Sequence, residues 1–305
     1  MLKKTPRSIQ LAGKVATGAI NSKIGVTCRG KTDGGGAQVL AVMSALAFAK
    51  DTGLTYFHTP FSSVAHAEDD PADWTNRWES FFSLGAGERT IGADDKRCVE
   101  VSAFLKHKNL YTDQDAIVAA QHFLDYTDRN PDAFLDVVAE LRRKYWLQPK
   151  EHISLHKSKN GLTVSVHVRR GDVSATHPMH ANRFTGDDLV MRTISDIQRV
   201  ALEAGRQIKV NVYSQGARSS FGLYADAGCE LYLNEDVFET YHNMVCADIL
   251  VMAKSALSYS AGLLGGGIKV YDPFWHPPMK DWIVRDPAGG IDGESLRRSL
   301  GSLRV

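Results

Sequence analysis

The sequence lacks an excess of charge of either sign. Its 305 residues include 36 lysines and arginines and 35 aspartates and glutamates, so the formal net charge is +1. Proteins that bind nucleic acids or acidic lipids usually carry a clear basic excess. We therefore expect no nucleic-acid partner, and we expect any anionic ligand to be held by a few placed side chains.

Cysteine is scarce, and its spacing is uninformative. The four cysteines are widely separated and form no CxxC pair, which argues against a structural zinc site and against a dense disulfide framework. Buried free thiols in a reducing compartment are the better interpretation. The residues concerned are Cys28, Cys98, Cys229 and Cys246.

Long apolar runs are also missing. No segment reaches the roughly 18 apolar residues of a membrane-spanning helix. The charged residues 1–4 are not followed by the apolar stretch of a secretory signal. We therefore expect a cytoplasmic protein without a membrane span.

The first half opens like a doubly wound α/β domain. Residues 24–28 are apolar and predict a strand, and a glycine-rich turn follows at 29–36. Apolar side chains at helical spacing over 38–50 predict a helix, and the aromatic and β-branched residues 54–58 predict a second strand. Strand, glycine turn, helix and strand in this order are typical of nucleotide-binding α/β domains.

Residues 59–150 are harder to interpret. We predict helices at 116–126 and 131–146, with Pro131 well placed at a helix start, and a helical apolar face formed by the aromatic residues at 74, 78, 81 and 82. The polar stretch at 150–161 breaks the pattern. We place the domain boundary there, which gives domains of 1–150 and 151–305.

The second half alternates between strand and helix patterns, which implies parallel βαβ units. The predicted fold class is therefore α/β, with two Rossmann-type domains facing across a cleft. The predicted strands are 163–168, 209–214, 230–233, 249–252 and, last, 268–271, and the predicted helices are 190–204, 237–245 and 258–264.

The most informative motif is Ser165-Val166-His167-Val168-Arg169-Arg170-Gly171-Asp172. Ligands of open α/β sheets bind beyond the carboxyl ends of the strands. Arginine pairs bidentately with phosphate oxygens and stays charged at any working pH. Successive strand residues point to opposite faces, so we expect Arg169 and Arg170 to differ in role. The alternative is a solvated arginine pair beside a turn residue, Asp172.

His167-Val168-Arg169-Arg170-Gly171-Asp172 resembles the H-x-R-R-G/T-D motif of the α1,2-, α1,6- and protein O-fucosyltransferases. In that superfamily the arginines contact the diphosphate of GDP-fucose. The resemblance implies that Arg169 binds the β-phosphate and that Arg170 assists. It also implies that His167 and Asp172 line the nucleotide site.

A second segment, Asp33-Gly34-Gly35-Gly36-Ala37-Gln38, resembles the G-x-x-G-N-Q loop of the same superfamily. Such a loop offers backbone N–H groups and a helix N-terminus to an anion. The resemblance places Gly34, Gly35, Gly36 and Gln38 at the donor. Ala37 stands where the family usually has asparagine, so that amide contact is absent. A plain tight turn is the alternative.

Two further segments add candidate donor contacts. Residues 255–262 resemble the late S-x-x-S-x-x-x-G/A stretch of the family, which implies contacts from Ser255, Ser258 and Ser260. Helix capping is the alternative for these hydroxyls. Ser214 and Gln215 end another predicted strand and are candidates for ribose or base contacts, with loop filler as the alternative.

Together these resemblances imply a GT-B-like fold and an inverting glycosyltransferase of carbohydrate biosynthesis, a fucosyltransferase that transfers fucose from GDP-fucose to a glycan acceptor. Residues 1–150 would form the acceptor side and 151–305 the nucleotide-sugar-binding domain. Arg169 and Arg170 would stabilise the leaving diphosphate, so we predict catalysis without a metal ion. The alternatives are a transferase on the same scaffold that uses another nucleotide sugar, and a non-catalytic glycan- or nucleotide-binding protein.

The general base and the acceptor contacts stay open. Asp33, His58 and His180 are candidates for the base because each is expected to face the cleft. The tryptophans Trp74, Trp78 and Trp146 could stack on an acceptor sugar, and the alternative for them is a helical core.

Overall fold

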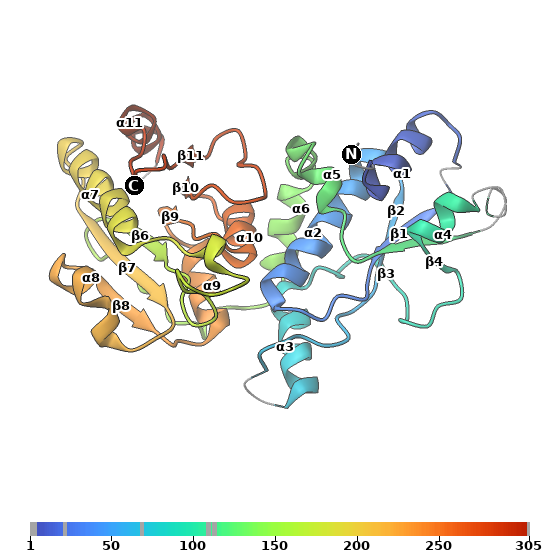
Figure 1. The fold of residues 1–305 in the computed structure, drawn as a ribbon, viewed down its shortest axis with the longest axis horizontal. Coiled ribbons are helices and arrows are strands. Elements are labelled where there is room, and N and C mark those ends of the chain that lie inside the picture. The colour runs from blue at the N-terminus through green and yellow to red at the C-terminus, as the bar shows by residue number, and fades with distance from the viewer. Residues whose placement is uncertain (1–4, 21–22, 68–69, 108–110, 112–114, 304–305) are drawn as a thin grey trace. The chain divides into compact units, whose positions relative to one another are not determined.

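The computed structural model describes residues 5–20, 23–67, 70–107, 111 and 115–303. The charged start of the chain, residues 1–4, lies outside them. The chain divides into two compact units, Met1–Lys150 and Glu151–Val305. Each unit has its own parallel sheet with helices around it (Figure 1). The prediction of two parallel-sheet α/β domains is therefore confirmed.

The first unit is built on a five-stranded sheet of order β3-β2-β1-β5-β4. Its strands are β1 (Gly25–Cys28), β2 (Thr55–His58), β3 (Arg89–Thr90), β4 (Cys98–Glu100) and β5 (Ile117–Ala120). Its helices are α1 (Arg7–Ala16), α2 (Gly35–Thr52), α3 (Pro71–Phe82), α4 (Val101–Lys106), α5 (Leu124–Thr127), the 3-10 helix η2 (Pro131–Phe134) and α6 (Val138–Tyr145). Helix α2 is apolar on all sides and is buried over most of its length, as a helix of a core must be.

The predicted helix at 116–126 is wrong over its first half. Residues 117–120 form β5, which pairs with β1 on one side and with β4 on the other. All four residues are buried. A short apolar run flanked by turns fits a buried strand and a buried helix equally well, so periodicity could not distinguish them.

The second unit is built on a six-stranded sheet of order β11-β10-β9-β6-β7-β8. Its strands are β6 (Leu162–His167), β7 (Ile208–Ser214), β8 (Glu230–Leu233), β9 (Ile249–Val251), β10 (Ile268–Tyr271) and β11 (Ile283–Val284). Its helices are α7 (Asp187–Glu203), α8 (Gly222–Asp226), α9 (Val237–Val245), α10 (Ala256–Leu264) and α11 (Gly293–Ser302), with 3-10 helices η3 (Ala181–Arg183) and η4 (Arg218–Phe221).

Every strand and helix predicted in the second half is present, but β10 is not the last strand. Strand β11 has only two residues, which is too short for a periodic pattern. Helix α11 packs against α7 and buries only Leu296 and Leu300. Its remaining residues are mostly polar or charged, so its apolar stripe is narrow and easily missed.

The order of strands reverses at β6. The chain proceeds from β6 to β7 and β8 on one side, then crosses back to β9, β10 and β11 on the other. The connections that leave β6 and β9 therefore diverge at their carboxyl ends. In open parallel sheets this switch point is where a crevice forms and a ligand binds.

The glycine-rich turn of the first unit permits a test of its packing. A Cβ atom at Gly35 would lie 2.3 Å from the Trp78 ring, which is closer than two carbon atoms can approach. We expect Gly35→Ala to lower the free energy of unfolding by about 1–3 kcal/mol through overpacking, as measured by urea denaturation. The control is Gly13→Ala in α1, where a Cβ would meet nothing within 4 Å. An unchanged midpoint for Gly35→Ala would contradict this contact.

Candidate functional site

A small cavity lies at the switch point of the second unit. Its lining comes from the residues that follow β6, β9, β10 and β11, together with residues of the loop before α7. Four arginines contribute to this lining, but only one carboxylate does. The ionisable residues concerned are Arg169, Arg170, Arg183, Arg285, Asp272 and His167. Such an excess of guanidinium groups favours an anionic ligand.

Arg169 lies just past the end of β6 and is paired with Asp172. Its Nε donates to Oδ1 of Asp172 at 3.2 Å, and its Nη2 donates to Oδ2 at 2.6 Å. Burial of Asp172 raises the pKa of its carboxyl, but the hydrogen bonds and charge of Arg169 outweigh it, so the pKa is lowered. Asp172 therefore stays ionised and fixes the orientation of the Arg169 guanidinium.

Arg170 faces a different set of partners. Its Nη1 donates to the carbonyl of Arg169 at 2.9 Å, and its Nη2 donates to the carbonyl of Thr185 at 3.0 Å and to Asp187 at 2.5 Å. The guanidinium also lies 4.3 Å from the centre of the Phe184 ring. Arg170 therefore fastens the end of the loop after β6 to the start of α7, as well as lining the cavity.

His167 is the last residue of β6 and is one of the residues that line the cavity. Its Nδ1 is buried and has no hydrogen-bond partner among the described residues. Burial and the charge of Arg169 lower the pKa of His167 to about 3. The imidazole is therefore neutral near pH 7, and it presents a polar atom that a bound ligand could satisfy.

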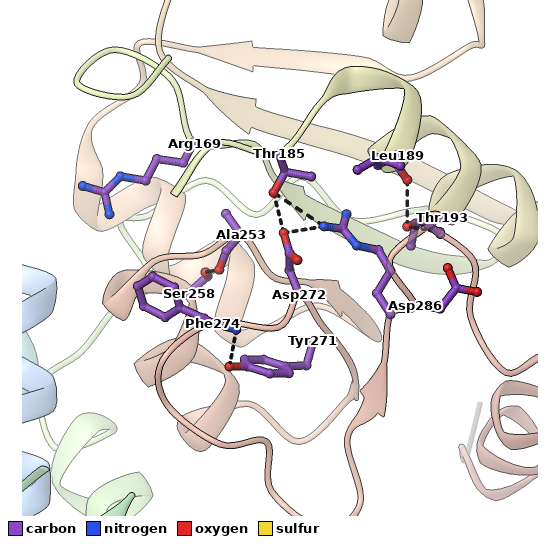
Figure 2. Close-up of polar contacts among 12 residues, drawn as sticks. Arg169, Thr185, Leu189, Thr193, Ala253, Ser258, Tyr271, Asp272, Phe274 and Asp286 are labelled. Atoms are coloured by element: carbon purple, nitrogen blue, oxygen red, sulfur yellow. Dashed lines mark hydrogen bonds and ion pairs between the residues drawn. The ribbon is translucent and has the colours of Figure 1, made fainter. Parts of the chain in front are cut away.

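A buried ion pair beside the cavity was not predicted from the sequence. Arg285 and Asp272 form an ion pair in which each side chain is only 5% exposed. Thr185 donates its hydroxyl to Asp272 at 2.5 Å (Figure 2). Asp272 directly follows the predicted strand at 268–271, and that position could have signalled it. Arg285 follows β11, which was not predicted.

Figure 2 shows the Arg169 side chain extending away from this buried group. The ion pair thus forms a fixed wall of the cavity, whereas Arg169, at 21% exposure, stays accessible to a ligand.

Ser214 and Gln215 support the arginine motif from the next strand. The Ser214 hydroxyl donates to the carbonyl of Val168 at 2.5 Å. Gly171 has a φ of +79°, and a Cβ there would lie 2.6 Å from Oε1 of Gln215. Gln215 therefore packs closely on the turn that requires a glycine. Neither residue is part of the cavity lining.

The three serines at α10 already form hydrogen bonds within the protein. Ser255 caps it by accepting a hydrogen bond from the Leu257 amide at 3.2 Å. Ser258 and Ser260 are fully buried. Ser258 donates to the carbonyl of Ala253 at 3.1 Å, and Ser260 donates to that of Leu257 at 3.0 Å. The hydroxyls of Ser258 and Ser260 thus stabilise the helix and leave no exposed surface for a ligand.

The glycine-rich loop belongs to the first unit, at the switch point between β1 and β5. Gly34 is the N-cap of α2, and Gly35 and Gly36 form its first turn. Gln38 is 2% exposed, and its amide donates to the carbonyls of Asp33 at 2.7 Å and Ser63 at 2.9 Å. Gln38 therefore holds the loop in shape.

The candidates for a general base lie in different surroundings. Asp33 forms an ion pair with Lys31 at 2.6 Å. His180 stacks on His177, with ring centres 4.6 Å apart. His58 is only 2% exposed and bonds Glu79 at 2.6 Å, so the expectation that it faces a cleft is wrong.

The tryptophans also differ in exposure. Trp74 and Trp78 are 2% and 3% exposed and belong to the core of the first unit, whereas Trp146 is 52% exposed. Only Trp146 of the three has a surface on which a sugar could stack. Sequence analysis did not consider Trp275, which is 49% exposed.

The structure also bears on the cysteines, on possible metal ligands and on membrane spans. All four cysteines are free, two of them buried and two partly buried. Within the described residues, no group of three or more His, Cys, Asp or Glu side chains could hold a metal ion, and no helix is long and apolar enough to cross a membrane. The prediction of metal-independent catalysis did not consider the Asp-x-Asp spacing at 113–115, of which only Asp115 lies inside the described residues.

No protein-family model matches the sequence, and no curated protein matches it either. Among solved structures, the chain is similar to a mutant of Arabidopsis thaliana FUT1 in complex with GDP, with 11% identity, a TM-score of 0.37, and coverage of 87% of this chain and 73% of that one. It is also similar to E. coli heptosyltransferase WaaC, with 13% identity, a TM-score of 0.40, and coverage of 92% and 99%.

A third similar structure is fucosyltransferase NodZ from Bradyrhizobium, with 12% identity, a TM-score of 0.38, and coverage of 79% of this chain and 93% of that one. These neighbours are GT-B glycosyltransferases.

The buried ion pair gives a prediction on stability. Asp272→Asn keeps the shape of the side chain but leaves the Arg285 charge buried without compensation, which costs about 3–5 kcal/mol. We expect a large loss in the urea midpoint of the second unit. The matched control is Glu294→Gln, which breaks the exposed pair with Arg298 and should leave the midpoint unchanged. Equal midpoints for the two variants would contradict this role.

His167 gives a prediction on pH. Because its folded pKa of about 3 lies below the ordinary value of 6.5, the unfolded chain binds a proton between these two pH values and the folded chain does not. The contribution of His167 to the free energy of unfolding is therefore complete above pH 6.5. It is lost as the pH falls toward 3, by at most about 1.4 kcal/mol per pH unit.

Denaturation of wild type and His167→Gln between pH 8 and pH 4 tests this. We expect the stability difference to shift in favour of the variant as the pH falls. Parallel curves would show that His167 titrates normally.

Proposed function

We propose that this chain is an inverting glycosyltransferase that binds the diphosphate of a nucleotide sugar at the switch point of its second unit, and that its donor is GDP-fucose and its acceptor a glycan. One observation carries the proposal. Four guanidinium groups and a single carboxylate line one cavity beyond the carboxyl ends of parallel strands. That position and that charge suit a nucleoside diphosphate.

The roles of the arginines follow from their contacts. Arg169 is oriented by Asp172 but remains partly exposed, so its guanidinium can bind phosphate oxygens. As the bond to the sugar breaks, negative charge grows on the diphosphate, and a preorganised guanidinium stabilises that charge without reorganising. Arg170 keeps the adjacent loop in place and adds a second positive charge to the cavity.

His167 would complete the diphosphate site. Its buried Nδ1 has no partner among the described residues, so a hydrogen bond to the ligand would remove the cost of an unsatisfied polar atom. We propose that these side chains supply the positive charge that a divalent ion supplies in other glycosyltransferases, and that the reaction needs no metal ion.

The specificity for GDP-fucose rests on the resemblance of residues 167–172 to the H-x-R-R-G/T-D motif. The first unit would contribute to the acceptor side. Ser214 and Gln215 would act by supporting the arginine motif, and Ser255, Ser258 and Ser260 by building α10.

The test is ligand binding followed by mutation of Arg169. Thermal shift against GDP, UDP, ADP and their sugars identifies the donor, because a ligand of the folded state raises the melting temperature by mass action. We expect GDP and GDP-fucose to give the largest shifts. A larger shift with another nucleotide would assign another donor, and the absence of any shift would remove the proposal.

In a transfer assay run with EDTA present, we expect Arg169→Ala to reduce turnover by a factor of about 10³. Arg169→Lys should restore little of it, because an ammonium cannot replace the planar fork of donors. Arg199→Ala, on the exposed surface of α7, is the control and should behave as wild type. Near-normal turnover of Arg169→Ala would remove this residue from the mechanism.

A further inference from the structure

We propose that Arg183 is a third phosphate-binding residue of this cavity and that Trp275 positions it. The inference rests on the proposed function, since it assigns a further contact to the same diphosphate. It concerns residues outside the arginine motif and outside every segment that the sequence singled out.

Arg183 ends the short helix η3, within the long loop that joins β6 to α7. Its side chain lines the cavity together with Arg169 and Arg170. Against the effect of burial, the hydrogen bond and charge of Arg169 lower the pKa of the Asp172 carboxyl, and the charge of Arg183 lowers it further, which agrees with a position of Arg183 near the Arg169–Asp172 pair.

The loop that carries Arg183 is held by contacts of the two residues that follow it. Next to Arg183, Phe184 lies against the Arg170 guanidinium, and Thr185 both accepts from Arg170 and donates to Asp272. The chain just after Arg183 is therefore fixed from two directions. A side chain that leaves the backbone at this point has a defined origin beside the cavity.

Arg183 lies over the indole ring of Trp275. Its guanidinium carbon is 4.9 Å from the centre of the Trp275 ring. The Trp275 ring in turn contacts Phe274, with centroids 3.6 Å apart. The amide of Phe274 donates to the Tyr271 hydroxyl at 2.9 Å (Figure 2). That hydroxyl donates to the carbonyl of His276. The turn that carries Trp275 is thus pinned by a buried tyrosine.

The cation–π contact involves only one part of the Arg183 guanidinium. A guanidinium that lies over an indole uses its flat face for the cation–π contact, and its N–H groups point outward in the plane. Those donors remain suited to a bidentate contact with phosphate oxygens. Trp275 is 49% exposed, and its ring supports the Arg183 side chain at the rim of the cavity.

Binding of inorganic pyrophosphate and of GDP, measured by isothermal titration calorimetry, tests the proposal. We expect Arg183→Gln to weaken both ligands by about 10- to 100-fold, the effect of losing a charge-assisted hydrogen bond. Trp275→Ala should weaken both by about 3- to 10-fold, and Trp275→Phe should restore most of the affinity. The double variant Arg183→Gln, Trp275→Ala should bind as weakly as Arg183→Gln alone, because Trp275 acts only through Arg183.

Two controls match the tested residues. Trp146→Ala removes a tryptophan of similar exposure, 52%, from the first unit, and Arg298→Gln removes an exposed arginine of α11. Neither should change the affinity for pyrophosphate. Ligand binding should also change the tryptophan fluorescence, and this change should be absent in Trp275→Phe.

The outcomes separate the two proposals. If wild type binds pyrophosphate, and Arg169→Ala abolishes binding while Arg183→Gln binds as wild type does, this inference fails and the proposed function stands. Additive effects in the double variant would refute the positioning role of Trp275. If wild type binds neither pyrophosphate nor any nucleoside diphosphate, both proposals fall together.

Discussion

The buried ion pair between Asp272 and Arg285 is the constraint on which the cavity depends. Two charges that are only 5% exposed are costly to desolvate, and they are tolerated because each compensates the other and Thr185 adds a hydrogen bond. The pair joins the residue after β10 to the residue after β11. It therefore holds together the loops that follow β10 and β11 at the switch point. Through Asp272 it also holds Thr185, which lies on the loop between β6 and α7.

The pair also decides the electrostatic character of the site. Asp272 is the one carboxylate in the lining, and its charge is already matched by Arg285. The remaining lining charges are positive, and His167 stays neutral because it is buried and next to Arg169. Arg169 and Arg170 pair with Asp172 and Asp187, which lie outside the lining, so these two guanidinium groups are oriented as well as positively charged.

The sequence predicted the strands of the second unit because their apolar runs alternate with clear helical patterns, and Arg169 and Arg170 were found because they end such a run. Three features could not be predicted in this way. Strand β5 has the composition of either a strand or a helix, β11 is two residues long, and the partners of Arg285 and Arg183 depend on contacts between segments about 13 to 100 residues apart in sequence.

The motif residues differ in what they can still bind, and resemblance alone does not reveal this. Ser258, Ser260 and Gln38 have the right chemistry for a donor contact, but the chain itself already uses their polar groups. His167 has a buried atom that lacks a partner in the described part of the chain, and Arg169 has an oriented, accessible guanidinium. Because a polar atom can bind a ligand only at the expense of its present partners, the proposed site rests on the groups with capacity to spare. In the second unit they gather at the end of β6, where the order of the strands reverses.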